Sequence, residues 1–90
     1  MDNSLNKTLY IIGTPPERTG FSLLPSHPAS PENISVVLIQ DGVRHQKLPF
    51  PHVFALSDDV LSGKLTSPFP SVSYQKLIEM IFKAESVAVL

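Results

Sequence analysis

The residues best suited to chemistry in this 90-residue chain are three histidines and a pair of aspartates. His27, His45 and His52 lie in proline-rich stretches that predict loops, and none has the helical i, i+4 spacing of zinc-binding motifs. Asp58 and Asp59 are adjacent, so at a helix start their carboxylates point in different directions, and the helix dipole favours acidic residues there. We therefore interpret the histidines as solvated loop residues and the aspartates as capping residues, and we predict no metal site.

The sequence also shows no motif that would provide a nucleophile for covalent catalysis. The chain has no cysteine, which excludes a thiolate nucleophile, a cysteine metal site and disulfides. No elbow motif surrounds the candidate serines, Ser22, Ser26, Ser57 and Ser62. The loop at 13–16 follows a predicted strand but lacks the glycine spacing of dinucleotide-binding loops. We predict no enzyme and no cofactor; an enzyme using His and Asp side chains is a third alternative without a nucleophile–base spacing to support it.

Composition limits the remaining classes of protein. Hydrophobic residues make up 42% of the chain, and seven basic against eight acidic residues give a net charge of −1, which offers no electrostatic case for nucleic acid or an anionic membrane. The apolar runs are shorter than the ~20 residues of a membrane span. Residues 1–7 are polar, predict a loose segment, and lack the pattern of a signal peptide. We expect one cytoplasmic domain over 1–90, small enough that association would stabilise it.

The elements that would position these residues alternate between strands and helices. The continuous apolar run Ile34–Ile39 is typical of a parallel strand covered on both faces, and we expect it to be the most buried element. Further strands are predicted at 9–12, 53–56 and 86–90. A short helix is expected at 17–24, a helical turn at 43–48 followed by an extended segment, and a helix at 58–62 capped by Ser57 or Asp58 and ended by a left-handed Gly63. This order predicts an α/β fold: a small three-layer sandwich with a mainly parallel sheet of four or five strands.

The strongest helical pattern begins after Ser73, a good N-cap residue. An apolar stripe follows at i, i+3, i+4, i+7 and i+8, formed by Tyr74, Leu77, Ile78, Ile81 and Phe82. We interpret this stripe as core, with a dimer face as the alternative.

A partner-binding surface is predicted where the strand at 34–39 ends. Ligand and partner sites of open α/β sheets lie beyond the carboxyl ends of the strands, which is where Gln40, Asp41, Gly42 and Val43 would lie. A plain strand-ending turn is the alternative. Apolar residues in or beside loops, such as Phe50, Val53, Leu65 and Phe69, look hard to bury within one chain, and exposed apolar patches often mark interfaces. We therefore add Phe50 to the predicted surface.

Three segments in order resemble the DsrH/TusB proteins of the DsrE/DsrF/DsrH-like superfamily. The segments are V-L-I-Q-D-G-V at 37–43, V-F-A-L-S-D-D-V-L-S-G-K-L at 53–65 and V-S-Y at 72–74; the strand at 9–12 and its Thr-Pro step also match. The similarity covers most of residues 8–85. It departs from the family in a shorter, proline-containing connection after Gly42 and in a first helix interrupted by Gly20 and Pro25.

The resemblance implies a cytoplasmic subunit of a sulfur-relay complex, acting either in 2-thiolation of the tRNA wobble uridine or in sulfur oxidation. The implied partners are DsrE/TusD-like and DsrF/TusC-like subunits. Some DsrH members carry a cysteine in the first helix and TusB-type members do not, so a chain without cysteine would be a non-catalytic subunit. The alternative is a stand-alone homo-oligomer that binds a partner or ligand without sulfur chemistry.

Overall fold

The computed structural model describes residues 8–17, 33–48 and 50–90. Within these ranges the elements follow one another as β1 (Thr8–Ile12), β2 (Ile34–Leu38), the 3₁₀ helix η3 (Gln40–Arg44), β3 (His52–Leu56), α1 (Ser57–Ser62), β4 (Ser71–Val72), α2 (Tyr74–Lys83) and β5 (Ser86–Val89). The predicted loose segment at 1–7 and nearly all of the predicted helix at 17–24 lie outside the described residues.

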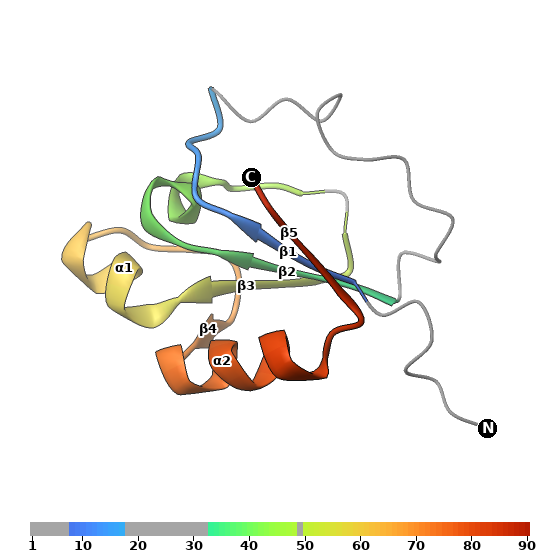
Figure 1. Ribbon diagram of the computed structural model, residues 1–90. Helices are drawn as coiled ribbons and strands as arrows, with labels where there is room; N and C mark the ends of the chain where they lie inside the picture. The colour runs from blue at the N-terminus through green and yellow to red at the C-terminus, as the bar shows by residue number, and fades with distance from the viewer. Residues whose placement is uncertain (1–7, 18–32, 49) are drawn as a thin grey trace.

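The five described strands form a single parallel sheet in the order β4-β3-β2-β1-β5 (Figure 1). The predicted α/β class with a parallel sheet is therefore confirmed. The strands predicted at 9–12, 34–39, 53–56 and 86–90 are all present. The two-residue strand β4 was not predicted, because Ser71 and Val72 follow a proline-rich loop and carry too few apolar residues to signal a strand.

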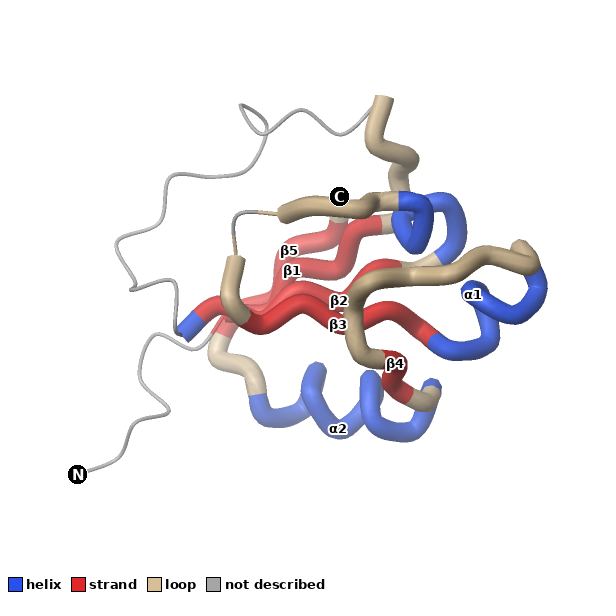
Figure 2. Tube along the Cα trace, turned by 180° about the vertical axis from the view of Figure 1, so that it is seen from behind, coloured by secondary structure: helices blue, strands red, loops and turns tan. Residues whose placement is uncertain are grey.

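The core is divided by the sheet, because successive side chains of a strand point to opposite faces. On one face Tyr10, Val36 and Leu38 pack with Phe50 and Phe69 from the connecting segments. On the other face α2 lies across the sheet, while the connections after η3 and α1 cover the first face (Figure 2). The sheet is thus covered by α2 on one side and by η3, α1 and the connections after them on the other, which is compatible with the predicted three-layer sandwich.

Burial differs from the expectation at two strands. All five residues of β1 are buried, whereas β2, the central strand, includes the half-buried Ser35. The prediction that 34–39 is the most buried element is therefore wrong in this detail, because the Ser35 side chain lines an open groove between the sheet and α2. Val53 is buried, and Phe50 and Phe69 pack against the core, so the expectation that these residues lack cover within one chain is also wrong.

The cap predicted at Ser73 is confirmed, since its Oγ accepts a hydrogen bond of 3.1 Å from the Lys76 amide. The caps predicted for α1 are wrong: Leu56 occupies the N-cap position, and no side chain caps the helix. The helical turn predicted at 43–48 lies instead at Gln40–Arg44, and His45 directly after it is extended. The prediction that Gly63 is left-handed is also wrong: Gly63 keeps a helical φ of −83°, and Lys64, with a φ of 54°, is the left-handed residue.

The end of α1 shows why the left-handed residue is Lys64. The Lys64 amide donates to the Leu61 carbonyl oxygen, and the Leu65 amide donates to that of Val60. This pair of hydrogen bonds is the Schellman arrangement, whose left-handed position is the residue after the helix cap. Gly63 is that cap, so the left-handed conformation moves one residue beyond the glycine.

The prediction that the stripe of α2 is core holds only in part. Leu77 is buried and packs on the sheet with Met80 and Ala84. The other members of the stripe are exposed, namely Tyr74, Ile78, Ile81 and Phe82. With Met80 added to the stripe, the apolar arc covers roughly 200° of the helix circumference, about twice what packing on one sheet face requires. None of the helices in the described ranges is long and apolar enough to cross a membrane.

Candidate functional site

The carboxyl end of β2 is shaped by a tight turn into η3. The Ile39 amide donates a 2.9 Å hydrogen bond to the Ile12 carbonyl oxygen of β1, which extends the sheet by one step. The chain then reverses at Gln40, whose φ of 50° is in the left-handed region. The Gly42 amide closes the turn on the Ile39 carbonyl oxygen at 2.7 Å. The residues after the strand therefore fold back over the sheet edge.

Gly42 is required at its position by the close approach of η3 to β1. A Cβ atom on this residue would lie 2.0 Å from the Ile12 carbonyl oxygen and 2.8 Å from its carbon. Both contacts are with backbone, which cannot move aside by changing a rotamer. The glycine of the Gln-Asp-Gly sequence thus serves packing, and its φ is not positive.

A carboxylate from α1 holds the turn in place. Asp59 Oδ2 accepts a 2.7 Å hydrogen bond from the backbone amide of Gln40. Hydrogen bonds to an ionised acceptor are shorter and stronger than neutral ones. Asp59, interpreted from sequence as a cap of its own helix, instead ties α1 to the end of β2.

A shallow cleft of about 300 Å³ opens beside this contact. Its lining comes from η3, from α1 and from the turn after α1, namely Gln40, Asp41, Val43, Arg44, Asp59, Ser62, Gly63 and Leu65. Arg44 forms an exposed ion pair of 3.2 Å with Glu17, which is worth little in water. The cleft presents a carboxylate, a guanidinium and an apolar edge, a mixture suited to a protein contact.

The structure brings together four of the five predicted partner-binding residues. Gln40, Asp41 and Val43 line the cleft, and Gly42 lies in the same turn. Gln40 and Asp41 are exposed, whereas Gly42 and Val43 are buried and give shape rather than contact area. Phe50 lies apart from them, in the extended connection, where its ring meets Tyr10 edge-on with centroids 5.8 Å apart.

The described histidines lie at opposite ends of the sheet. His45 follows η3 and is buried, with Nε2 donating to the Thr14 carbonyl oxygen at 3.2 Å, so its interpretation as a solvated loop residue is wrong. His52 is exposed at the start of β3, and His27 lies outside the described residues. Within 8–17, 33–48 and 50–90, no group of three His, Asp or Glu side chains is placed to hold a metal ion.

The sequence interpretation missed an apolar surface formed by α2 and β5, which we call the α2–β5 surface. It consists of exposed residues of both elements, Tyr74, Ile78, Ile81, Phe82, Val87 and Val89. Register places Val87 and Val89 beside Leu9 and Ile11, on the sheet face that α2 covers. The signal was present in the width of the apolar arc on the helix, which exceeds what one sheet face can cover.

No protein-family model matches the chain, and no curated protein matches it. The similarity to DsrH and TusB therefore depends on the three sequence segments and their order.

Proposed function

We propose that this chain is a non-catalytic subunit of a cytoplasmic sulfur-relay complex similar to those that contain DsrH or TusB. Its role is to dock the subunits that carry sulfur. The observation that supports docking most directly is the α2–β5 surface, whose exposed apolar area is at the upper end of what a monomer ordinarily presents.

The size of the α2–β5 surface fits a specific contact. Phe82 is 82% exposed, Val89 71% and Tyr74 60%. With Ile78, Ile81 and Val87 they leave on the order of 600 Å² open, most of the ~800 Å² that each partner contributes to a standard interface. Aromatic anchors such as Tyr and Phe are enriched in the centres of such contacts.

The strand beside these side chains adds a second docking element. β5 is an edge strand of the described sheet and pairs with β1 on one side only. An open edge next to an apolar face invites another chain to pair with it. The cleft at Gln40 and Asp41, at the carboxyl ends of the strands, supplies a polar contact away from this surface.

Chemistry limits what the subunit does within the relay. Stable sulfur carriage needs a thiolate, and the chain has no cysteine. The persulfide would therefore pass between cysteines of DsrE/TusD-like and DsrF/TusC-like partners. The uridine or the sulfur-oxidation substrate is then reached through those partners, without direct contact between this chain and nucleic acid.

The second candidate is a stand-alone homo-oligomer, which the same edge strand favours. Two copies related by a two-fold axis would pair β5 with β5 and cover both α2–β5 surfaces at once. This alternative needs no sulfur chemistry.

The relay is tested by examining the gene neighbourhood for DsrE-like and DsrF-like chains with cysteines and co-expressing this chain with them. We expect the three chains to co-purify in a fixed ratio. A radiolabelled persulfide donor should label cysteines of the partners and leave this chain unlabelled. Purification of this chain alone as a stable dimer that ignores the other two would support the homo-oligomer and refute the relay.

A further inference from the structure

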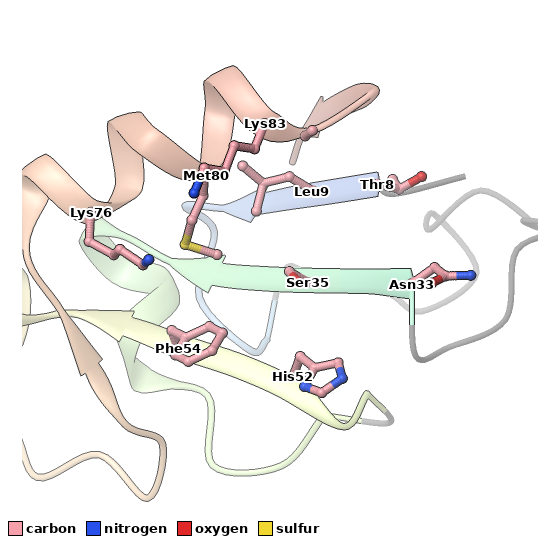
Figure 3. Close-up of a pocket in the computed structure, with 10 residues that line it drawn as sticks. Thr8, Leu9, Asn33, Ser35, His52, Phe54, Lys76, Met80 and Lys83 are labelled. Atoms are coloured by element: carbon pink, nitrogen blue, oxygen red, sulfur yellow. The ribbon is translucent and has the colours of Figure 1, made fainter. Parts of the chain in front are cut away.

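A second hollow, a groove of about 360 Å³, lies between α2 and the amino ends of β1, β2 and β3 (Figure 3). It is at the opposite end of the strands from Gln40 and Asp41. Thr8 and His52 are the first residues of β1 and β3, and both line it. Its volume falls within the range of small-molecule sites.

The groove is open because the central strand β2 has a small polar residue, Ser35, where it faces α2. Register aligns Leu9, Ser35 and His52 as one row across β1, β2 and β3, on the face that α2 covers. The next row, Ile11, Val37 and Phe54, is apolar throughout. Ser35 therefore leaves a space that a larger side chain would fill, and it supplies a hydroxyl at the floor of the groove.

The charges that line the groove have one sign. Lys76 and Lys83 reach it from α2, and none of its ten lining residues is acidic. The His52 imidazole, opposite them on β3, is a polar neighbour. The Lys76 ammonium lies 3.9 Å from the Glu79 carboxylate, and because this ion pair is exposed it is weak. Within the described part of the chain Lys83 has no ion pair. Two ammonium groups without an acidic neighbour in the groove favour an anion.

The remaining lining is apolar and partly aromatic. Phe54 and Met80 are half-buried and face each other across the groove from β3 and α2. An aromatic ring and a thioether form a surface on which a flat ring packs well. The groove thus combines a cationic part with a place for a ring.

We propose that this groove binds a small aromatic phosphate monoester. The Lys76 and Lys83 ammonium groups hold the phosphate, and the ring of the ligand lies between Phe54 and Met80. His52 and the Ser35 hydroxyl supply further polar contacts. The site is independent of docking on the α2–β5 surface, because it opens on the side of α2 that carries the lysines.

Phenyl phosphate titrated into the ¹⁵N-labelled protein tests the proposal. We expect saturable shifts of the Ser35, His52 and Phe54 amides and weaker shifts elsewhere. The double variant Lys76→Gln/Lys83→Gln should weaken binding at least about tenfold, because both charged hydrogen-bond donors are lost. The matched control, Lys47→Gln/Lys64→Gln, removes two exposed lysines outside the groove and should bind as the parent does.

Two further probes separate the parts of the ligand. Inorganic phosphate and phenol should each bind at least about tenfold more weakly than phenyl phosphate, since each lacks one half of the contact. Equal weakening in both double variants would mean unspecific charge attraction and would overturn the site. If inorganic phosphate binds as tightly as phenyl phosphate, the aromatic part of the proposal is wrong. If phenyl phosphate causes no saturable shift at 10 mM, the whole proposal is wrong, because this concentration is on the order of ten times the ~1 mM at which weak complexes form.

Discussion

The carboxylate of Asp59 and the backbone amide of Gln40, 19 residues apart, are joined by a 2.7 Å hydrogen bond. This bond links the start of α1 to the residue where β2 turns back with a positive φ. It fixes one wall of the cleft at the carboxyl ends of the strands. The contact explains why an acidic residue stands at this position when its own helix has no side-chain cap.

Replacing Asp59 with Ala should lower the free energy of unfolding by about 1 kcal/mol more than replacing Asp58 with Ala. Both residues lie in the first turn of α1 and interact similarly with the helix dipole, but the Gln40 amide bonds only Asp59. Urea denaturation of both variants measures the difference. Equal losses would show that the hydrogen bond does not stabilise the fold.

Gly42→Ala should destabilise the protein by about 3 kcal/mol, because the new Cβ would meet the Ile12 backbone and rotamer changes cannot relieve the contact. Gly13→Ala is the control. Its Cβ would approach the Gln40 side chain at 3.3 Å, and that flexible group can move, so a loss below about 1 kcal/mol is expected. Thermal unfolding of the two variants gives the comparison, and a Gly42 variant as stable as the parent would contradict the packing of η3 on β1.

Tyr10→Phe should raise the free energy of unfolding by about 1 kcal/mol. The Tyr10 hydroxyl is buried and has no hydrogen-bond partner within the described part of the chain, so its removal ends an uncompensated desolvation. The ring contact with Phe50 is kept. Guanidinium denaturation measures the change, and a loss of stability would mean that the hydroxyl has a partner in solution.

The same residue predicts a pH dependence. Burial raises the pKa of Tyr10 above its ordinary value, because the ionised phenol is poorly solvated in the core. The unfolded state begins to lose this proton near pH 10 while the folded state retains it, so stability falls as the pH rises past about 10. The difference in stability between parent and Tyr10→Phe should therefore widen at high pH. The range from pH 8 to pH 11 includes the ordinary tyrosine pKa of about 10. If the stability difference between the parent and Tyr10→Phe stays constant over this range, the predicted pH dependence is wrong.

The strands and α2 could be predicted from sequence because their signals are local. A continuous run such as Ile34–Ile39 and a capping residue such as Ser73 indicate structure without knowledge of neighbours. The sheet order could not be predicted, and neither could the burial of His45, which depends on Thr14 31 residues away. At the site, Gln40 and Asp41 were found because strand ends are expected there, whereas the Asp59 contact depends on tertiary packing.

At Phe50 and Phe82 the local sequence pattern predicts burial wrongly, in opposite directions. Phe50 lies between two prolines in a predicted loop, yet its ring packs on Tyr10 because the extended connection runs over the sheet. Phe82 belongs to a regular helical stripe, yet it is 82% exposed because α2 offers the sheet only the side that carries Leu77 and Met80. Local pattern identifies the element but does not tell which part of a wide apolar arc meets the core.

The most direct test of docking through the α2–β5 surface is the mass of the assembly formed by Phe82→Glu. Phe82 is the most exposed member of the surface, so the variant should fold with the parent's far-ultraviolet spectrum, and a charge within an apolar contact should weaken association by at least about 30-fold. The control is Leu61→Glu, which changes a 74% exposed apolar residue of α1 outside this surface. The masses are measured by sedimentation equilibrium, with the co-expressed partners or, if the protein is a homo-oligomer, with this chain alone. Phe82→Glu should have the mass of a single chain, whereas Leu61→Glu should assemble like the parent. Equal masses for Phe82→Glu and the parent at low micromolar concentration would contradict the account.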